Sequence, residues 1–487
     1  MNKLITIGLS CFLCGFNLLA QQSIYNVRFS GVEEKKVFVD AELFLQDSVL
    51  IMSPNGPVPE RWDDYVENLE AKSKSGDEIK ITKREGKWIV QGPLEQHINI
   101  SYEINVDHED IEWPGGIDGV AFVKDWGFFL TGRSLFIFPE DNNDELVVKF
   151  DVDDPSKIQA PWPSSSKGYL VKDNTELTES LIIYGDHAYK KIEREDLKIR
   201  FVLTGEKIQA DSLRYSQIAD QVMNYYYNLM GGGPTPNGNQ STEVMVVINS
   251  ASQTDGEVIG SHINMMVNPD AHPQEQMVAW FMFAHEFFHL WNGKTIMVNS
   301  TRDDWFKEGI TNYYTLKALY QVGFINDQAL AGIFNGLFYQ RYMKDPGLGE
   351  ISMRDAAEGF SKDDHWGLIY GGGLFVGIGM DMIIREETNN EKSLDDIMKL
   401  LYEKYKLKNE YYTSEEILKL ASEMADKDLA SFFDVYINGS TVIPIDEFLE
   451  KAGYHVVIEN DNLIMTPKEN LEGLDLAIRE GFLGEVE

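Results

Sequence analysis

Cysteine is almost absent from this chain of 487 residues. The two cysteines that occur, Cys11 and Cys14, both lie within the first twenty residues. If that segment is removed from the mature protein, no cysteine remains. This excludes disulfide bonds and thiolate metal ligands, even for an exported protein.

Long apolar runs are also scarce. Lys3 precedes a mostly apolar stretch from Leu4 to Leu19, and Leu18-Leu19-Ala20 resembles a cleavage sequence. Residues 1–20 therefore predict a signal peptide and an exported protein, periplasmic or extracellular. Two alternatives are a membrane-spanning helix, weakened by glycines in a short run, and a lipoprotein anchor, weakened by the absence of a large aliphatic residue three positions before each cysteine. We expect no transmembrane segment in the mature chain.

Basic residues are few relative to acidic ones. The chain has 43 Lys and Arg against 79 Asp and Glu, a formal net charge of −36. Such a charge disfavours nucleic acid as a partner, because phosphates would be repelled. It favours solubility outside the cytoplasm, and attraction of cationic peptides is the second interpretation.

The length predicts two or three domains. From Ile24 to about Val152 apolar residues alternate with other residues, as in 98–106, and turn sequences such as Pro54-Asn55-Gly56-Pro57 separate the runs. This alternation predicts strands with one buried face and a β-sandwich-like N-terminal domain over 21–152. Its expected role is binding or scaffolding. The polar, proline-containing stretch 153–167 is the predicted linker.

The pattern changes after the linker. Strands are expected near 181–184, 197–203 and 243–248, with a helix from about 211 to 230 between the last two. From Pro273 onward the chain is mainly helical, and Thr413 with Glu416 predicts a capping box. The predicted fold is therefore multi-domain α+β, with a second domain over 168–455 that has a helical C-terminal part, and a tail over 456–487.

The clearest chemical signal is an HExxH sequence within a helix predicted over 273–292. His285 and His289 lie four residues apart, so both project from one face and can share a zinc ion. Glu286 points at a different angle, which suits contact with a zinc-bound water as general base. The alternative is an ordinary amphipathic helix with two surface histidines.

A third ligand is needed, because water or substrate takes the fourth position of a catalytic zinc site. Glu308 follows His289 at a distance that allows a second helix to lie against the first. Asn312, one turn further, is placed to orient a ligand. We therefore predict one Zn²⁺ per chain, bound by His285, His289 and Glu308.

These segments resemble the gluzincins, and most of all the glycyl aminopeptidase family. Residues 285–292 are similar to that family's zinc helix, and 305–314 to its third-ligand helix. Tyr370-Gly371-Gly372-Gly373 resembles its Tyr-x-Lys-Gly sequence, and residues 393–398 and 429–434 also match. The resemblance implies a thermolysin-like catalytic domain in which Tyr370 donates a hydrogen bond to the oxyanion.

The chain departs from the family pattern in three places. Ser261 is found where the family has a Glu that reads a free amino group, although His262 matches the next position. Gly372 replaces the Lys of Tyr-x-Lys-Gly. The roughly forty residues after Ile445 are too few for the PDZ domain that family members often carry. His365, close before Tyr370, is interpreted as a structural histidine or, less favoured, as an aid to proton transfer.

The sequence thus predicts a zinc-dependent peptidase acting on peptides or proteins, with Glu286 and Tyr370 as catalytic residues. The family resemblance favours an aminopeptidase. The missing amino-reading Glu favours an endopeptidase. A catalytically silent, zinc-containing peptide-binding protein is the alternative from another class.

Overall fold

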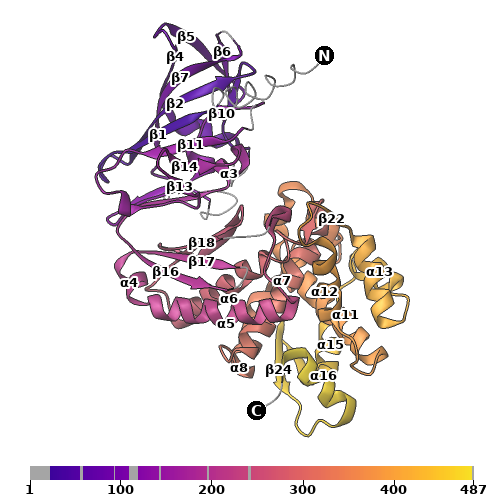
Figure 1. The fold of residues 1–487 in the computed structure, drawn as a ribbon. Helices are drawn as coiled ribbons and strands as arrows, with labels where there is room; N and C mark the ends of the chain where they lie inside the picture. Colours follow the sequence, from indigo (N-terminus) through magenta and orange to yellow (C-terminus); the bar gives the residue numbers. More distant parts are fainter. Residues whose placement is uncertain are drawn as a thin grey trace, which may run out of the picture. The chain divides into compact units, whose positions relative to one another are not determined.

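The protein is described by a computed structural model that covers residues 22–484, except 55–58, 93, 109–118, 142–143, 195–196 and 240–242. The predicted signal peptide and most of the turn predicted at 54–57 lie outside these residues. The chain divides into two compact units (Figure 1). The first comprises Met1–Tyr189, Val202–Gln209 and Met245–Asn249, and the second Lys190–Phe201, Ala210–Val244 and Ser250–Glu487.

The first unit is rich in strands, as the alternation predicts. Its larger sheet has eleven strands in the order β10-β3-β6-β5-β4-β7-β2-β1-β11-β14-β13. The longest strands, β2 (Lys36–Leu45) and β7 (Gln96–Asn105), pair antiparallel at its centre. In β2 the side chains of Val37, Val39 and Leu43 are at most 1% exposed, which is the buried face that a period of two produces. The other strands are β1 (Ile24–Phe29), β3 (Val49–Ile51), β4 (Val66–Ser73), β5 (Glu78–Arg84), β6 (Lys87–Gln91), β10 (Phe138–Pro139), β11 (Leu146–Phe150), β13 (Ser164–Ser165) and β14 (Gly168–Val171).

A second sheet of four strands completes the first unit, in the order β12-β15-β9-β8. Its strands are β8 (Phe122–Lys124), β9 (Gly127–Thr131), β12 (Ile158–Gln159) and β15 (Leu181–Gly185). Strands β12 and β13 lie inside the predicted linker 153–167, and β14 pairs with β11. The first unit therefore continues to Tyr189, because these short strands hydrogen-bond to its sheets rather than connect two domains.

A five-stranded sheet, in the order β16-β17-β18-β20-β19, precedes the helical part of the chain. It contains β16 (His187–Glu193), β17 (Lys198–Thr204), β18 (Val244–Ser250), β19 (Asp255–Ile259) and β20 (His262–Val267). Strands β19 and β20 form an antiparallel hairpin in which Ile259 pairs with His262. Gly260 opens the two-residue turn with φ +62, a conformation that glycine adopts without strain.

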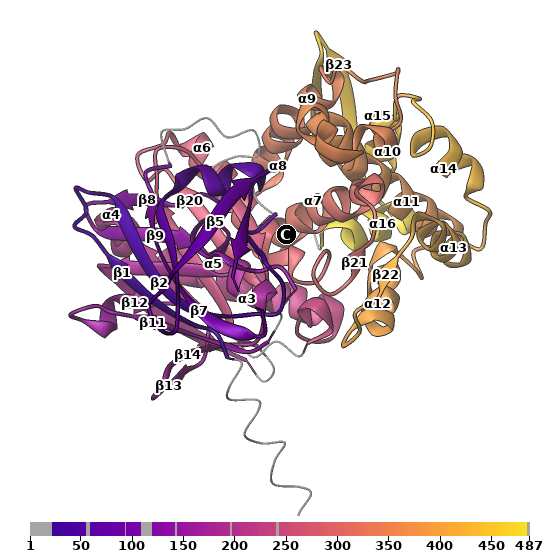
Figure 2. The ribbon, with the colours of Figure 1, turned by 90° about the horizontal axis from the view of Figure 1, so that it is seen from above.

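Four helical segments form the centre of the second unit. They are α5 (Ser212–Met230), α6 (Pro273–His289), α7 (Asp304–Gln321), and η8 (Gly367–Gly372) with its continuation α11 (Gly373–Glu387). Helix α7 packs against α6 and against η8 and α11 (Figure 2). Phe288 of α6 and Tyr314 of α7, whose ring centroids lie 5.0 Å apart, are fully buried at the first of these contacts. The predicted helices at 211–230 and 273–292 thus exist with nearly the expected ends.

The contact between α7 and α11 depends on two glycines. A Cβ on Gly309 would lie 2.1 Å from the carbonyl carbon of Gly373, and one on Gly373 would lie 2.2 Å from the carbonyl oxygen of Trp305. The backbones therefore approach more closely than any larger residue permits. Glycine in a helix interior costs about 1 kcal/mol relative to alanine, so this close approach is the physical reason for glycine here.

The C-terminal part packs around α11 with further helices and one hairpin. It includes α12 (Leu394–Tyr405), α13 (Ser414–Ala425), α14 (Ala430–Tyr436), α15 (Ile445–Lys451), β23 (Tyr454–Glu459), β24 (Asn462–Pro467) and α16 (Gly473–Leu483). The Thr413 side chain accepts a hydrogen bond from the Glu416 N–H, which is one half of the predicted capping box. Within the predicted tail 456–487, the described residues up to Leu483 are folded, since Arg479 and Phe482 of α16 are buried.

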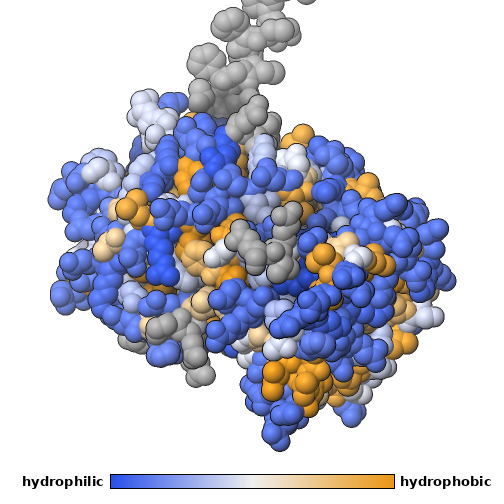
Figure 3. All heavy atoms as spheres, turned by 90° about the horizontal axis from the view of Figure 1, so that it is seen from below, coloured by the Kyte–Doolittle hydropathy of each residue, from blue (hydrophilic) through white to orange (hydrophobic). Residues whose placement is uncertain are grey.

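The face drawn in Figure 3 is mostly hydrophilic, with several hydrophobic patches. The span Gly367–Glu387 is long and apolar enough to cross a membrane, which the sequence analysis did not expect. However, 89% of its apolar window is buried inside the protein, as expected for a core helix. It does not show a transmembrane segment.

Candidate active site

Three predicted ligands converge in the second unit. The Nε2 atoms of His285 and His289 lie 3.4 Å and 3.2 Å from Oε2 of Glu308. A tetrahedral zinc site with ligand bonds of about 2.0–2.1 Å has edges of about 3.3 Å between ligand atoms. The two measured distances match such edges, so the residues fit a zinc ion. All three residues are at most 9% exposed.

Hydrogen bonds determine which ring nitrogen of His285 and of His289 faces Oε2 of Glu308. His285 donates from Nδ1 to Oδ1 of Asn312 at 2.8 Å, and His289 donates from Nδ1 to the backbone oxygen of Asn292 at 2.9 Å. Each Nε2 is then a lone-pair donor, which is the form that binds a metal. Burial, followed by the charge of His289, lowers the pKa of His285 to about 4, which keeps this imidazole neutral.

Asn312 connects the three elements that carry the site. While its oxygen accepts from His285 on α6, its Nδ2 donates to the backbone oxygen of Tyr370 at 3.1 Å. Asn312 itself lies on α7, one turn beyond Glu308. The structure therefore places it where the sequence analysis expected a ligand-orienting residue.

Glu286 lies beside the three ligands and is 7% exposed. Burial raises its pKa well above the usual value, and the negative charges of Glu308, Glu257 and Asp255 raise it further. A carboxylate with a raised pKa is a stronger base, as a general base working near neutral pH requires.

Tyr370 lies on η8, a π-helical turn that precedes α11. Its ring is 6.4 Å from that of His285 and stacks on Trp366 at 4.8 Å with an interplanar angle of 2°. Burial raises the pKa of its hydroxyl above the usual value, so the phenol remains protonated and can donate a hydrogen bond. Single π-helical turns inside α-helices are frequent at functional sites.

The other candidate residues have different surroundings. Ser261 lies in the turn between β19 and β20. His262 is buried on β20, and burial together with the charges of Arg200 and Lys294 lowers its pKa to about 3. His365 bonds through Nδ1 to Oδ1 of Asp345 at 2.8 Å, in agreement with a structural role.

Sequence reasoning missed two carboxylates that belong to this site. Asp255 and Glu257 occupy alternate positions on β19 and therefore share one face of the hairpin. Both interact electrostatically with Glu286. The sequence analysis compared only position 261 with the family pattern, although the alternation of Asp255, Glu257 and Ile259 was a signal for a strand with these groups on one side.

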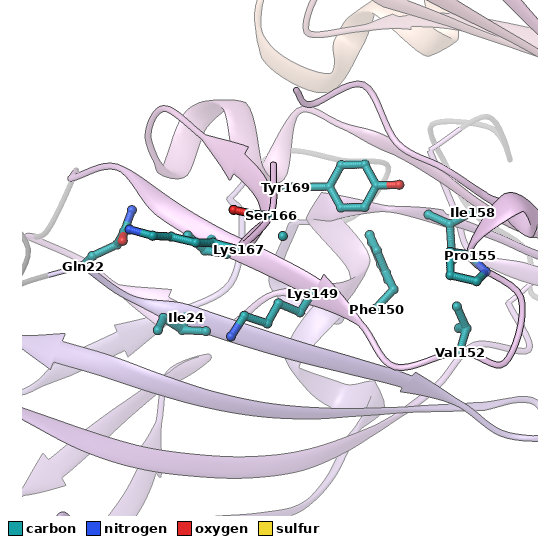
Figure 4. Close-up of a pocket in the computed structure, with 12 residues that line it drawn as sticks. Gln22, Ile24, Lys149, Phe150, Val152, Pro155, Ile158, Ser166, Lys167 and Tyr169 are labelled. Carbon is teal, nitrogen blue, oxygen red and sulfur yellow. The ribbon is translucent and has the colours of Figure 1, made fainter. Parts of the chain in front are cut away.

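A cavity of about 450 Å³ lies elsewhere, in the first unit (Figure 4). Apolar side chains such as Phe150 and Tyr169 line it, together with Lys149 and Lys167. Its lining includes no histidine and no carboxylate, so it does not offer the chemistry of the cluster around Glu308.

Comparison with known proteins confirms the resemblance stated above. Residues 279–370, which contain His285 to Glu308 and Tyr370, match the family model of the M61 glycyl aminopeptidases. No curated protein sequence matches this chain.

Solved structures share the fold. An aminopeptidase N family protein from Idiomarina loihiensis is 15% identical, with a TM-score of 0.76, over 90% of this chain and 79% of that one. An M1 zinc metallopeptidase from Deinococcus radiodurans is 12% identical, with a TM-score of 0.51, over 88% and 95%. Aminopeptidase A from Legionella pneumophila, in complex with aspartic acid, is 12% identical with the same TM-score over 86% of this chain and 49% of that one.

These likenesses confirm the predicted fold class, a β-rich N-terminal part followed by a zincin-like part with a helical C-terminal region. Together with the three convergent ligands, they support a hydrolase of the peptidase type. The chain is similar to the M61 glycyl aminopeptidases in sequence around the site, and to aminopeptidase N family proteins in fold.

Proposed function

We propose that this protein is a zinc-dependent aminopeptidase. The observation that carries the proposal is that His285 Nε2 and His289 Nε2 both lie at a tetrahedral-edge distance from Glu308 Oε2, 3.4 Å and 3.2 Å. One zinc ion per chain bound by these atoms would polarise a peptide carbonyl and lower the pKa of a water molecule. The residues around it supply the remaining steps.

Glu286 acts as the general base. Its raised pKa suits it to accept a proton from the attacking water and then to donate that proton to the leaving amine. Tyr370, which stays protonated, donates a hydrogen bond to the carbonyl oxygen as negative charge develops there. Asn312 is hydrogen-bonded to both the His285 ring and the Tyr370 backbone, and so holds them at a fixed distance from each other.

The choice of aminopeptidase over endopeptidase rests on Asp255 and Glu257. Their electrostatic interaction with Glu286 places two negative charges near the catalytic base. A free N-terminal ammonium is the substrate group that such charges attract. We propose that these carboxylates bind that ammonium, so that the first peptide bond is the one presented to Glu286.

The test compares two peptide pools, one with free and one with acetylated N-termini, for the wild type and Glu257→Gln. We expect hydrolysis of the free pool, a strong preference over the acetylated pool, and a higher KM for Glu257→Gln. Equal cleavage of both pools by the wild type would indicate an endopeptidase. Bound zinc without cleavage of either pool would indicate a peptide-binding protein.

We also propose that the protein is exported. The sequence of residues 1–20 supports this, with Lys3 before an apolar stretch that ends at Ala20. Cell fractionation with N-terminal sequencing should find a mature chain that begins at Gln21 outside the cytoplasm. A chain in the cytoplasm that retains Met1 would contradict it.

A further inference from the structure

A lysine that no sequence signal identified lies against the third metal ligand. Lys362, in the 3₁₀-helix η7 (Gly359–His365), places Nζ 2.8 Å from Oε1 of Glu308 and 2.9 Å from Oδ2 of Asp304. Both carboxylates are 3% exposed. Charge-assisted hydrogen bonds of this length are strong, and in a buried site they fix geometry.

The two oxygens of Glu308 consequently have different partners. Oε2 faces His285 and His289, whereas Oε1 accepts hydrogen bonds from Lys362 and lies 3.2 Å from Nζ of Lys307. A carboxylate free to rotate would offer either oxygen, or both, to a metal ion. Here the ammonium groups hold one oxygen and leave the other pointing toward the histidines.

Lys362 also separates two like charges. Asp304 and Glu308 lie four residues apart on α7, where neighbouring carboxylates destabilise a helix. Without a cation between them, repulsion would favour rotation of Glu308 away from the metal ligands. The Lys362 ammonium contacts both carboxylates and, together with that of Lys307, opposes this tendency.

The same ammonium reaches Tyr370. Nζ lies 5.2 Å from the centroid of the Tyr370 ring. A cation within about 6 Å of an aromatic ring is attracted to it, so this contact fixes the position of the ring and with it the direction of the hydroxyl. Lys362 thus contacts both the ligand Glu308 and the proposed oxyanion donor.

Gly372 occupies the position where the related family has a lysine, and its surroundings differ from those of Lys362. A Cβ on Gly372 would lie 3.2 Å from Cε2 of Tyr342 and 3.4 Å from Cε of Met353. A side chain at 372 would therefore begin against Tyr342 and Met353. The ammonium beside Tyr370 comes from Lys362, on a separate helical turn.

We propose that Lys362 is a positioning residue that holds Glu308 in its metal-binding orientation and, through its contact with the ring, Tyr370 in its oxyanion-binding orientation. The Tyr370 half of this inference rests on the proposed function. The Glu308 half depends only on metal binding.

Lys307 is a matched control. Its side chain is 23% exposed, as is that of Lys362, and its Nζ also contacts Glu308 and Asp304, at 3.2 Å and 3.1 Å. The contacts of Lys307 with described residues do not include Tyr370. Removal of either lysine should disturb Glu308, but only removal of Lys362 should act through the tyrosine.

The experiment uses Lys362→Met and Lys307→Met, each in the wild type and in Tyr370→Phe. Loss of zinc to a chelator is measured for every protein, together with kcat and KM. We expect faster zinc loss in both lysine variants. For Lys362→Met alone we expect kcat to fall about 10- to 100-fold, the usual size for such supporting contacts, with KM nearly unchanged.

Coupling gives the decisive comparison. Lys362→Met should lower kcat much less in Tyr370→Phe than in the wild type, whereas the effect of Lys307→Met should be the same in both. Lys362→Arg should recover part of the loss. If Lys362→Met does not fold, Lys362→Gln, which keeps a hydrogen-bond donor without the charge, replaces it.

Two outcomes overturn the proposal. One is zinc loss from the Lys362 variants at the wild-type rate, and the other is a kcat effect that adds fully to that of Tyr370→Phe. If the wild type cleaves no peptide, the proposed function fails instead, and the zinc-loss measurement alone decides whether Lys362 holds Glu308.

Discussion

Two clusters of buried charge lie along α7, and they are built differently. Near the start of the helix, Oε2 of Glu308 lies close to the Nε2 atoms of His285 and His289. All three atoms offer lone pairs and none carries a proton to donate. Further along, Asp381 accepts hydrogen bonds from Tyr313, from Arg385 and from the Leu394 N–H, at 2.7–2.8 Å. In the second cluster the protein itself supplies a hydrogen-bond donor for each acceptor. In the first, the three converging lone pairs need a cation between them.

The difference separates buried charge that supports the fold from buried charge that supports chemistry. In the second cluster, Asp395 likewise accepts from Tyr314 and Lys317, so each acceptor has a donor. Burial of polar groups is tolerated there because their hydrogen bonds are complete. Acceptors that converge on one point, as in the first cluster, are stable only with a metal ion or a proton between them.

The largest expected effect tests the first cluster. Glu286→Gln removes the proposed general base and should lower kcat by about 10³-fold. Zinc content and the melting temperature should remain close to those of the wild type, because Glu286 is not a ligand and its buried carboxylate becomes a neutral amide. Steady-state kinetics and metal analysis check this. Unchanged kcat would remove Glu286 from the mechanism.

The converse variant tests the second cluster. Asp381→Asn leaves the Arg385 guanidinium, 4% exposed, without its charged partner. Breaking a buried ion pair in this way costs about 3–5 kcal/mol, so the free energy of unfolding in urea should fall by that amount. The folded protein should still bind zinc. Loss of zinc from a folded, fully stable variant would contradict the division between the clusters.

A pair of tyrosines sharpens the comparison. Tyr313→Phe removes the hydrogen bond to Asp381 and should cost about 1.5–3 kcal/mol of stability, as for bonds to charged groups, without altering kcat. Tyr370→Phe should instead lower kcat about 10²-fold, as loss of an oxyanion donor does, with little change in stability. Kinetics and unfolding curves for both proteins are needed. A loss of stability with unchanged kcat in Tyr370→Phe would contradict the proposed role of Tyr370.

The smallest effect concerns the helix contact that brings the site together. Gly373→Ala places a methyl group against the Trp305 carbonyl and should cost about 1–3 kcal/mol, as overpacking does. It should also lower kcat by separating Glu308 from Tyr370. Gly336→Ala is the control, since no atom lies within 4 Å of a Cβ there. Equal behaviour of the two variants would show that the close approach is unimportant.

Local patterns predicted the elements that carry the ligands. Residues four apart, such as His285 and His289, project from the same face of a helix, and alternating apolar residues, as around Val37 and Ile98, are typical of strands. The helix and the strands could therefore be predicted from the local sequence alone. Asn312 could be predicted because it lies one turn from Glu308.

Contacts between distant segments could not be predicted in this way. Lys362 reaches Glu308 across 54 residues, through a 3₁₀-helix with no distinctive sequence. Asp255 and Glu257 depend on the register of a hairpin, and the strands at 158–165 are too short to show a period. The close approach of Gly309 and Gly373 likewise becomes visible only when both helices are in place.

The most direct test of the central claim is an anomalous diffraction measurement at the zinc absorption edge, on crystals of the purified protein. We expect one peak per chain, about 2.0–2.2 Å from His285 Nε2, His289 Nε2 and Glu308 Oε2. A peak elsewhere, or none in protein supplied with zinc, would contradict it.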